Sequence, residues 1–232
     1  MIGELVGTGA TAAAIAGWGV YNPRSRLFGP VIRHGPARAH ALYLTFDDGP
    51  NPGATPAILD ILAREQVPAT FFVVGKHVHR YPEVARAIAC SDQGIGNHTW
   101  SHVKLHRRGP RRIRQELRSC HRILSDQVGV TPRFFRAPHG YRNPFLRPAT
   151  RSLGYETVAW TIGVWDSARP GTEVIRERVR RALAPGAIIL LHDGDGYDPV
   201  ADRTQTAWAL RGIIRDARDA GYEFRPLAEL AR

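Results

Sequence analysis

The stretch ALYLTFDDGP, residues 41–50, is an apolar run that ends in two adjacent carboxylates. Its aromatic and aliphatic residues predict a buried β-strand over residues 41–46. Asp47 and Asp48 follow at the carboxyl end of that strand, and the Gly-Pro pair after them predicts a turn. Because a turn alone would explain Asp-Asp-Gly-Pro, the chemical meaning of the two carboxylates depends on what the rest of the chain brings beside them.

Downstream of this strand, short apolar runs alternate with stretches of helical periodicity. Alternating strands and helices predict a parallel sheet, and this many units in one compact chain favour a barrel over an open sheet. A chain of 232 residues is an ordinary length for one such barrel. We therefore expect an α/β protein whose residues 41–232 form a single-domain distorted (β/α) barrel of seven strands. Residues 1–40 are expected to form an N-terminal apolar segment and arm.

The boundaries of the expected elements follow from the same periodicities. The expected strands are residues 41–46, 69–74, 94–97, 133–136, 156–161, 187–191 and 222–224. The expected helices are residues 56–65, 83–90, 110–127, 144–153, 172–183 and 204–220, with a helical tail at the end of the chain.

Two histidines, His98 and His102, lie in the run NHTWSH directly after the third expected strand. Two histidines four residues apart are often only the polar face of a helix. Together with one carboxylate, however, two imidazoles form a ligand set that suits zinc or a similar divalent ion. If Asp48 is that carboxylate, Asp47 beside it is free to act as a base. The sequence therefore indicates a metal-dependent hydrolase.

Polar side chains also follow the other expected strands. The residues found where a strand ends are Asp47, Asp48, His98, His102, Arg136, Asp166 and His192. The carboxyl ends of the strands are the face on which α/β barrels assemble their active sites. Independent loop residues would not be expected to cluster in this way, so the pattern weighs more than any single motif.

The composition restricts the class of protein. A hydrophobic content of 43% is enough for a large core and argues against an intrinsically disordered chain. The net charge of +11 raises the question of nucleic-acid binding. Only two of the 32 basic residues are lysines, which suggests genomic base composition, and no nucleic-acid-binding motif accompanies them. We expect no nucleic-acid partner, although a basic surface suits an anionic polymer such as cell-envelope material.

The N-terminal residues 5–21 carry no charge, but they are mostly Ala, Gly and Thr and are short for a membrane span. Glu4 stands where a secretory signal has a basic residue, and no clear cleavage site follows. Two interpretations stay open: a weak membrane anchor, or an extra helix or arm packed against the barrel. The localisation is therefore open between cytoplasm, membrane and export, and the oligomeric state is not predicted.

Other polar or reactive residues receive simpler interpretations. Cys90 and Cys120 lack metal-ligand or redox spacing, so both are expected to be buried small hydrophobes, with a disulfide as the alternative. His77 is expected at the surface. The run HDGDGYD, residues 192–198, is expected to be a flexible acidic loop at the edge of a cleft, because it lacks the glutamate that completes a calcium loop.

Five motifs in order resemble those of the polysaccharide deacetylase family, the NodB-homology domain of carbohydrate esterase family 4. The likeness runs from about residue 41 to residue 230 and implies the distorted barrel of that family. The five motifs are residues 45–50, residues 98–102, RAPHG at residues 136–140, the surroundings of Asp166, and LLH at residues 190–192. Residues 202–227 also resemble the nodulation chitooligosaccharide deacetylases of the family. Five motifs in order form a specific signal, whereas one alone would be weak.

The sequence departs from the family pattern at four positions. His139 stands where a tyrosine is usual, and Ser167 stands where a tryptophan usually follows the aspartate. Gly163 replaces a frequent aspartate, and Gly94 replaces a usual glutamate. These positions shape the wall of the cleft, so the departures bear on the range of substrates more than on the chemistry.

The resemblance implies a role for the residues of the first two motifs. Asp48, His98 and His102 would hold one divalent metal, with Zn²⁺ as the first choice and Co²⁺, Ni²⁺ or Mn²⁺ as alternatives. The metal would polarise the acetyl carbonyl and activate a water molecule. Asp47 would act as the general base, oriented by Arg136.

The later motifs would complete the reaction. His192 would protonate the leaving amine, and Asp166 would favour the imidazolium form of His192. The loop of Pro138 and His139 would stabilise the oxyanion through a backbone N–H. The candidates for the apolar pocket that accepts the acetyl methyl are Leu190 and Trp160.

The resemblance implies an acetylated glycan as the partner. The expected reaction is the removal of N-acetyl groups from N-acetylglucosamine-containing glycans, such as chitooligosaccharides or peptidoglycan, with release of acetate. Two alternatives stay open: an O-acetyl esterase acting on xylan-like polysaccharide, and a non-catalytic glycan-binding protein of the same fold. The intact set of ligands and acid/base candidates argues against the second.

Overall fold

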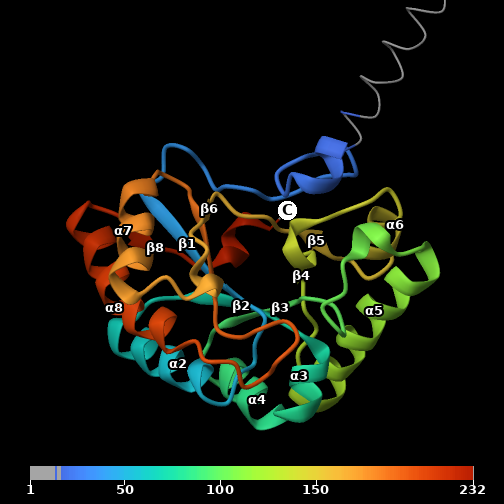
Figure 1. Ribbon diagram of the computed structural model, residues 1–232, viewed down its shortest axis with the longest axis horizontal. Helices are drawn as coiled ribbons and strands as arrows, with labels where there is room; N and C mark the ends of the chain where they lie inside the picture. The colour runs from blue at the N-terminus through green and yellow to red at the C-terminus, as the bar shows by residue number, and fades with distance from the viewer. Residues whose placement is uncertain (1–13, 15–16, 232) are drawn as a thin grey trace, which may run out of the picture.

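The computed structural model describes residue 14 and residues 17–231. Within these residues, seven parallel strands form a curled sheet in the order β5-β4-β3-β2-β1-β7-β6, and a short β8 pairs with the start of β1 (Figure 1). The strands are β1 (Ala41–Asp47), β2 (Ala69–Val73), β3 (Gly94–Asn97), β4 (Phe134–Phe135), β5 (Glu156–Thr157), β6 (Ile162–Gly163), β7 (Ile188–His192) and β8 (Glu223–Phe224). This architecture confirms the predicted distorted (β/α) barrel.

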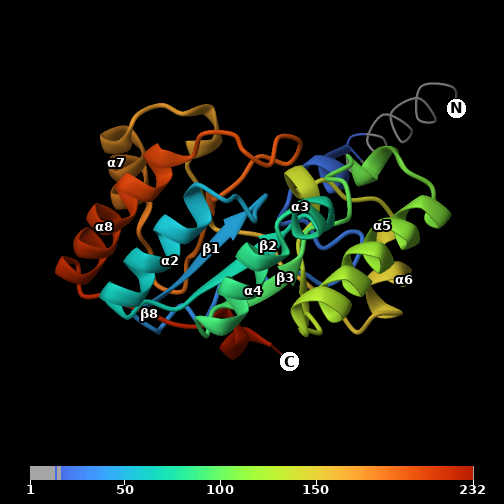
Figure 2. The same cartoon turned by 90° about the horizontal axis from the view of Figure 1, so that it is seen from below.

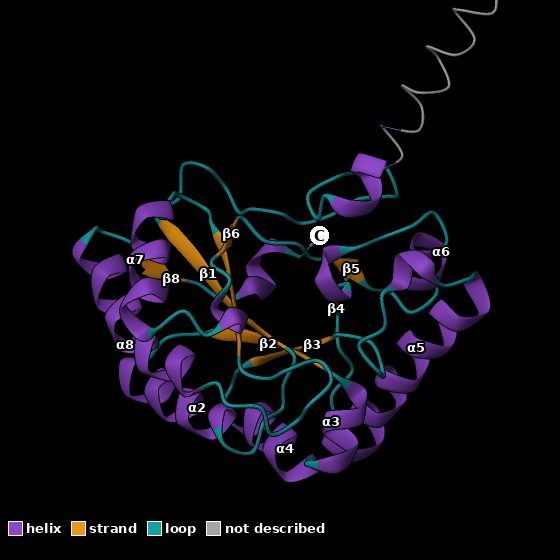
Figure 3. Ribbon diagram, viewed as in Figure 1, coloured by secondary structure: helices purple, strands orange, loops and turns teal. Residues whose placement is uncertain are grey.

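The helices lie on the outside of the curled sheet, as the secondary-structure colouring of Figure 3 makes clear. They are α2 (Ala54–Glu65), α3 (Gly75–Arg80), α4 (Pro82–Cys90), α5 (Pro110–Ile123), α6 (Leu146–Arg151), α7 (Thr172–Ala182) and α8 (Thr204–Asp219). A π-helical turn, Leu124–Val128, continues α5. Seen from below in Figure 2, β1, β2 and β3 run side by side with α2, α3 and α4 close to them. The short helix α3 was not predicted.

The alternation of side chains along the strands decides which residues face the interior of the barrel. On β1, Leu42 and Leu44 belong to the large apolar cluster that includes residues of α2 and α8. Ala41 and Tyr43 belong to a different cluster, whose other members include Phe72, Phe134 and Ile188 on neighbouring strands. This second cluster contains no residue of α2 or α8. Because successive side chains point to opposite faces, Asp47 shares the inner face with Ala41 and Tyr43.

The same parity applies to β4 and β7. Phe134 and Ile188 belong to the inner cluster, so Arg136, Leu190 and His192, each two or four residues further along, also face inward. The apolar part of the interior therefore lies toward the amino ends of the strands. The polar part lies at their carboxyl ends.

The expected strand at residues 156–161 is shorter than predicted: only Glu156–Thr157 form a strand, β5, and β6 begins at Ile162, just after the predicted end. β5 pairs with β4, whereas β6 pairs with β7 at the other end of the strand order. The residues between them cross the opening of the barrel, which is why one continuous strand cannot form there. The N-terminal arm covers this crossing, since Ile32 accepts a hydrogen bond from the Ala159 N–H (2.8 Å) and donates one to the Thr157 carbonyl (2.9 Å).

Three smaller expectations concern the cysteines, the candidate membrane segment and the domain boundary. Cys120 is buried as predicted, but Cys90 is exposed, and both are free thiols. Most of residues 5–21, the candidate membrane segment, lies outside the described residues. Among the residues that are described, no helix has both the length and the apolar character needed to cross a bilayer. The boundary at residue 40 stays a prediction.

Candidate active site

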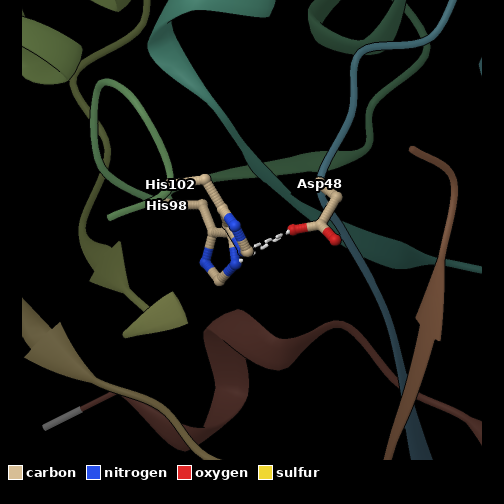
Figure 4. A group of neighbouring side chains, drawn as sticks. All are labelled: Asp48, His98 and His102. Carbon is tan, nitrogen blue, oxygen red and sulfur yellow. Dashed lines mark ion pairs between the residues drawn. The ribbon is translucent and has the colours of Figure 1, made fainter. Parts of the chain in front are cut away.

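Asp48, His98 and His102 converge on one point just beyond β1 and β3 (Figure 4). Oδ1 of Asp48 lies 3.0 Å from Nε2 of His102 and 3.3 Å from Nε2 of His98. All three residues are buried, and each offers one ligand atom within 4.8 Å of the others. Three protein ligands leave coordination positions for water and substrate, as in catalytic zinc sites.

The hydrogen bonds of these side chains fit a cation between them. Nδ1 of His98 donates to the carbonyl oxygen of Arg136 at 2.9 Å, so Nε2 of the neutral ring carries a lone pair. That lone pair faces Oδ1 of Asp48, a buried acceptor with no hydrogen-bond donor. Buried acceptors that face each other are stabilised by a bound cation, so the donor set fits a divalent metal.

The two histidines lie in an irregular turn rather than on a helix face. Thr99 and His102 have positive φ angles of 70° and 53°. The Thr99 N–H donates to Oδ1 of Asn97 at 2.8 Å, and the His102 N–H donates to Oγ1 of Thr99 at 3.0 Å. These local bonds replace the helical ones and direct both imidazoles toward Asp48.

His77 supports the site from outside, contrary to the expectation of a surface residue. It is 4% exposed, and its Nδ1 donates to the backbone carbonyl of Asp48 at 2.9 Å. Asp48 has a φ of 77°, a left-handed conformation that an aspartate tolerates better than most residues. The bond from His77 therefore helps to hold Asp48, a candidate metal ligand, in its left-handed conformation.

Asp47 is held by a fully buried arginine. Nη1 of Arg136 donates to Oδ1 of Asp47 at 2.6 Å and to Oγ1 of Thr45 at 2.9 Å. Nη2 donates to the carbonyl of Ala159 at 3.0 Å, and the guanidinium lies 4.2 Å from the centre of the Phe72 ring. Burial lowers the pKa of Arg136, and Asp47 opposes that shift. The second oxygen of Asp47 lies 3.7 Å from Nε2 of His98, so it faces the same point as the three ligands.

His192 and Asp166 form a second pair in the same site, in which Asp166 is buried and His192 is partly buried. Nδ1 of His192 donates to Oδ1 of Asp166 at 2.8 Å, and the His192 N–H donates to Oδ2 at 2.8 Å. Thr206 donates a further hydrogen bond to Oδ2 at 2.9 Å. Burial alone would lower the pKa of His192, but the Asp166 carboxylate raises it to about 9. The Asp166 carboxylate therefore favours the protonated form of the imidazole.

One cavity of about 440 Å³ is lined by Asp47, Asp48, His98, His102 and His192. Its volume is within the roughly 300–1,000 Å³ range of small-molecule sites. His139, Leu190 and Trp160 also line it, as do the exposed rings of Trp165 and Tyr197. Pro138 is buried and is not among the residues that line the cavity. Asp166 is buried behind His192. The cavity thus contains most of the residues that the sequence assigned to the site.

Asp193 is a site residue that the sequence analysis did not identify. Instead of lying in an acidic surface loop, it is fully buried, and it accepts hydrogen bonds from Thr55 Oγ1 (2.5 Å) and the Gly49 N–H (3.2 Å). Burial raises its pKa to about 7. It fastens the turn after Asp48 to β7. The only local signal was its place next to His192.

Comparison with known proteins agrees with this geometry. The family model described as polysaccharide deacetylase matches residues 34–158, more than half of the chain. The chain belongs to the polysaccharide deacetylase family. A chitooligosaccharide deacetylase of Bradyrhizobium sp. (strain ANU 289) is 39% identical over 199 residues, which cover 82% of this chain and 90% of that protein. A peptidoglycan-N-acetylglucosamine deacetylase of Bacillus cereus is 34% identical over 202 residues, which cover 85% of this chain and 91% of that protein.

A solved structure of the same fold adds a contrast. It is a mutant, with restored enzymatic activity, of a carbohydrate esterase family 4 pseudoenzyme from Bacillus anthracis. The polysaccharide deacetylase described here superposes on it with a TM-score of 0.80 at 29% identity, over 87% of this chain and 71% of that one. Family members are hydrolases that use a metal, and the Asp48, His98 and His102 cluster is a possible site for it.

Proposed function

We propose that this deacetylase uses a divalent metal to remove N-acetyl groups from N-acetylglucosamine-containing glycans and releases acetate. The observation that carries the proposal is the convergence of Asp48, His98 and His102 beside the Asp47 carboxylate. The names of the chitooligosaccharide and peptidoglycan relatives support the substrate class. Each of the residue roles below belongs to this proposal.

Zinc is the proposed metal, because one carboxylate and two imidazoles with open positions form a common catalytic zinc site. Cobalt, nickel and manganese accept similar ligands and are the alternatives. When bound, such an ion supplies Lewis-acid polarisation of a carbonyl and lowers the pKa of water. The rest of the reaction depends on side chains of this chain.

Asp47 is proposed as the general base. Its Oδ1 is occupied by Arg136, which leaves Oδ2 to accept a proton from an attacking water on the side of the cluster. The backbone N–H of His139 is proposed to donate to the carbonyl oxygen as negative charge develops there. Leu190 and Trp160 line the cavity and are proposed to contact the acetyl methyl group.

His192 is proposed as the general acid, since its protonated imidazole lies in the same cavity and Asp166 stabilises its positive charge. An amine is a poor leaving group unless it is protonated, so an acid of this kind matters most for an amide. This reasoning favours the N-deacetylase over the O-acetyl esterase. The basic surface is proposed to serve anionic glycans rather than nucleic acid.

A panel of acylated glycans tests the proposal. Purified protein loaded with zinc should release acetate from chitooligosaccharides or peptidoglycan faster than from acetylxylan, and a chelator should abolish the release. Restoration by added zinc is the control for the chelator. Acetate release only from acetylxylan would support the esterase, whereas no release from any of the three, at full zinc occupancy, would support a non-catalytic glycan-binding protein.

Replacing the acid should separate amides from esters. We expect His192→Ala to reduce kcat on an N-acetylated chitooligosaccharide about 100-fold or more, because the amine would leave unprotonated. On an aryl acetate ester, whose leaving group needs no proton, the loss should be only a few-fold. His40→Ala, an exposed histidine before the start of β1, is the matched control. Equal losses on amide and ester would contradict the assignment of His192.

Asp166 should set the alkaline limit of activity. Because Asp166 raises the pKa of His192 to about 9, the wild-type acid stays protonated, and kcat/KM should fall only as the pH passes that value. In Asp166→Asn the pKa of His192 should decrease, so this alkaline limb should move to lower pH. The pH profile of kcat/KM measures the shift, with Asp219→Asn at the exposed end of α8 as the control. An unchanged limb would show that His192 does not carry the proton.

A further inference from the structure

The cavity is too small for a polymer to lie wholly inside it. Its volume of about 440 Å³ is toward the lower end of sites that enclose a single small ligand. A glycan of several units would therefore contact the surface beside the cavity as well. The surface that continues from the cavity wall decides how many units the enzyme recognises.

The N-terminal arm is fastened to that wall. The N–H of Arg142 donates to the Val20 carbonyl at 3.2 Å. The Arg142 guanidinium is buried and donates to the carbonyls of Pro23 (3.1 Å) and Ser25. At the cavity wall itself, Nε of Arg24 donates to the carbonyl of Trp160 at 3.1 Å. The arm is thus bound to two of the segments that line the cavity.

The contact reaches the loop of the third motif. Gly140, with a φ of +72°, lies against Pro23 and Trp160, and a side chain at this position would collide with both. A glycine here lets the arm approach the loop that carries His139. Figure 1 shows the arm, in dark blue, beside the yellow segment that follows β4.

A row of rings leads from the metal ligands to the arm. The ring of His102 lies 4.9 Å from that of His139, which lies 5.5 Å from that of Tyr141. Tyr141 lines the cavity, and its ring is 5.2 Å from that of Tyr21. His106 lies 5.0 Å from Tyr141 and 5.4 Å from Tyr21, so it packs against both tyrosines.

Tyr21 is the outermost ring of this row, and the row is open to solvent at that end. The residue is 55% exposed even though its ring packs edge-on against two others. A rigid, half-exposed tyrosine offers an apolar face together with a hydroxyl, at a low cost in conformational entropy. The apolar face of a pyranose ring, surrounded by hydroxyl groups, is a matching ligand.

We propose that the N-terminal arm forms part of the glycan-binding groove, and that Tyr21, whose ring packs edge-on against that of Tyr141, stacks on a sugar unit beyond the one that is deacetylated. The inference rests on the proposed function and makes it more specific. It assigns to the enzyme an oligosaccharide or polymer as substrate, rather than a single N-acetylglucosamine. It also gives the arm, which precedes the family match at residue 34, a function in substrate recognition.

Chain-length kinetics test the proposal. For the wild type, kcat/KM should be higher on the N-acetylglucosamine tetramer than on the monomer. Tyr21→Ala should raise KM for the tetramer about three- to ten-fold, leave kcat unchanged, and leave the monomer unaffected. Tyr21→Phe keeps the ring and should stay within about two-fold of the wild type. Trp208→Ala is the matched control, because Trp208 is 68% exposed on α8 and does not line the cavity.

A binding measurement separates this inference from the proposed function. The affinity for the tetramer is measured calorimetrically in the Asp47→Asn background, with and without Tyr21→Ala, where the second change should weaken binding by a similar factor of about three to ten. An active wild type in which Tyr21→Ala alters neither KM nor affinity would overturn the subsite and leave the proposed function intact. A wild type that releases no acetate, but binds the tetramer through Tyr21, would overturn the proposed function and leave the subsite intact. Equal kcat losses on monomer and tetramer would also overturn the subsite, since Tyr21 would then only support the loop of His139.

Discussion

Asp47→Asn is expected to lower kcat by about 10²–10⁴-fold while the protein keeps its metal. The loss follows because an amide cannot accept the proton of the attacking water. Metal binding should survive, since Oδ1 of Asp48, not Asp47, is the oxygen closest to the two imidazoles. Acetate release and metal content after dialysis, measured on the same sample, check both halves of this prediction.

The folding of this variant has to be verified, because Asp47 neutralises a buried arginine. Removing one partner of a buried ion pair costs about 3–5 kcal/mol when the other charge is left alone. The amide oxygen of the substituted asparagine can still accept the bond that Arg136 donates to Asp47 at 2.6 Å, so the cost should be smaller than for alanine. Asp60→Asn is the control, since Asp60 forms an exposed pair with Arg64 that contributes little. A variant with near-wild-type kcat would refute the assignment of the base.

The sequence could place the candidate site residues at one end of the barrel because each of them stands at or just after the end of an expected strand. Asp47 and His192 occupy paired positions on β1 and β7, and both expected strands ended within a residue of them. Arg136 directly follows β4. Residues that end parallel strands must meet on one face of the barrel, so no long-range information was needed.

Several features that the sequence missed depend on contacts between distant residues. The partner of Asp193 is Thr55, 138 residues away, and the burial of His77 depends on its bond to Asp48. The strand predicted at residues 156–161 stops after Thr157, because β5 pairs with β4 while the next strand, β6, pairs with β7 at the other end of the strand order. Local patterns cannot report contacts of this kind.

The comparison with the pseudoenzyme separates what the fold provides from what the individual side chains provide. The wild-type pseudoenzyme of Bacillus anthracis superposes on this chain with a TM-score of 0.79, so the same scaffold is retained in a protein described as a pseudoenzyme. The fold therefore explains where the side chains lie, but the chemistry depends on which side chains are present. In this chain, the three candidate ligands, the base candidate and the acid candidate are all present and line one cavity.

Asp48→Ala is expected to abolish metal retention and to reduce activity on the order of 10³-fold or more, since a catalytic ion contributes several kcal/mol to the barrier. The two imidazoles would remain but would lack the anionic ligand between them. Alanine also tolerates the φ of 77° at this position poorly, at a cost of about 1–2 kcal/mol. Part of any loss could therefore come from folding.

Asp48→Asn separates the two causes. Asparagine tolerates a left-handed conformation and keeps the shape of the side chain, and the bond from His77 goes to the backbone oxygen, which neither change removes. Both variants should lose the metal on dialysis, but compared with the metal-free wild type only the alanine variant should melt at a lower temperature. If either variant kept one equivalent of zinc, the ligand set of Asp48, His98 and His102 would be wrong. If Asp48→Asn lost the metal while its fold and melting temperature matched those of the metal-free wild type, the loss of metal binding would come from the carboxylate charge and not from misfolding.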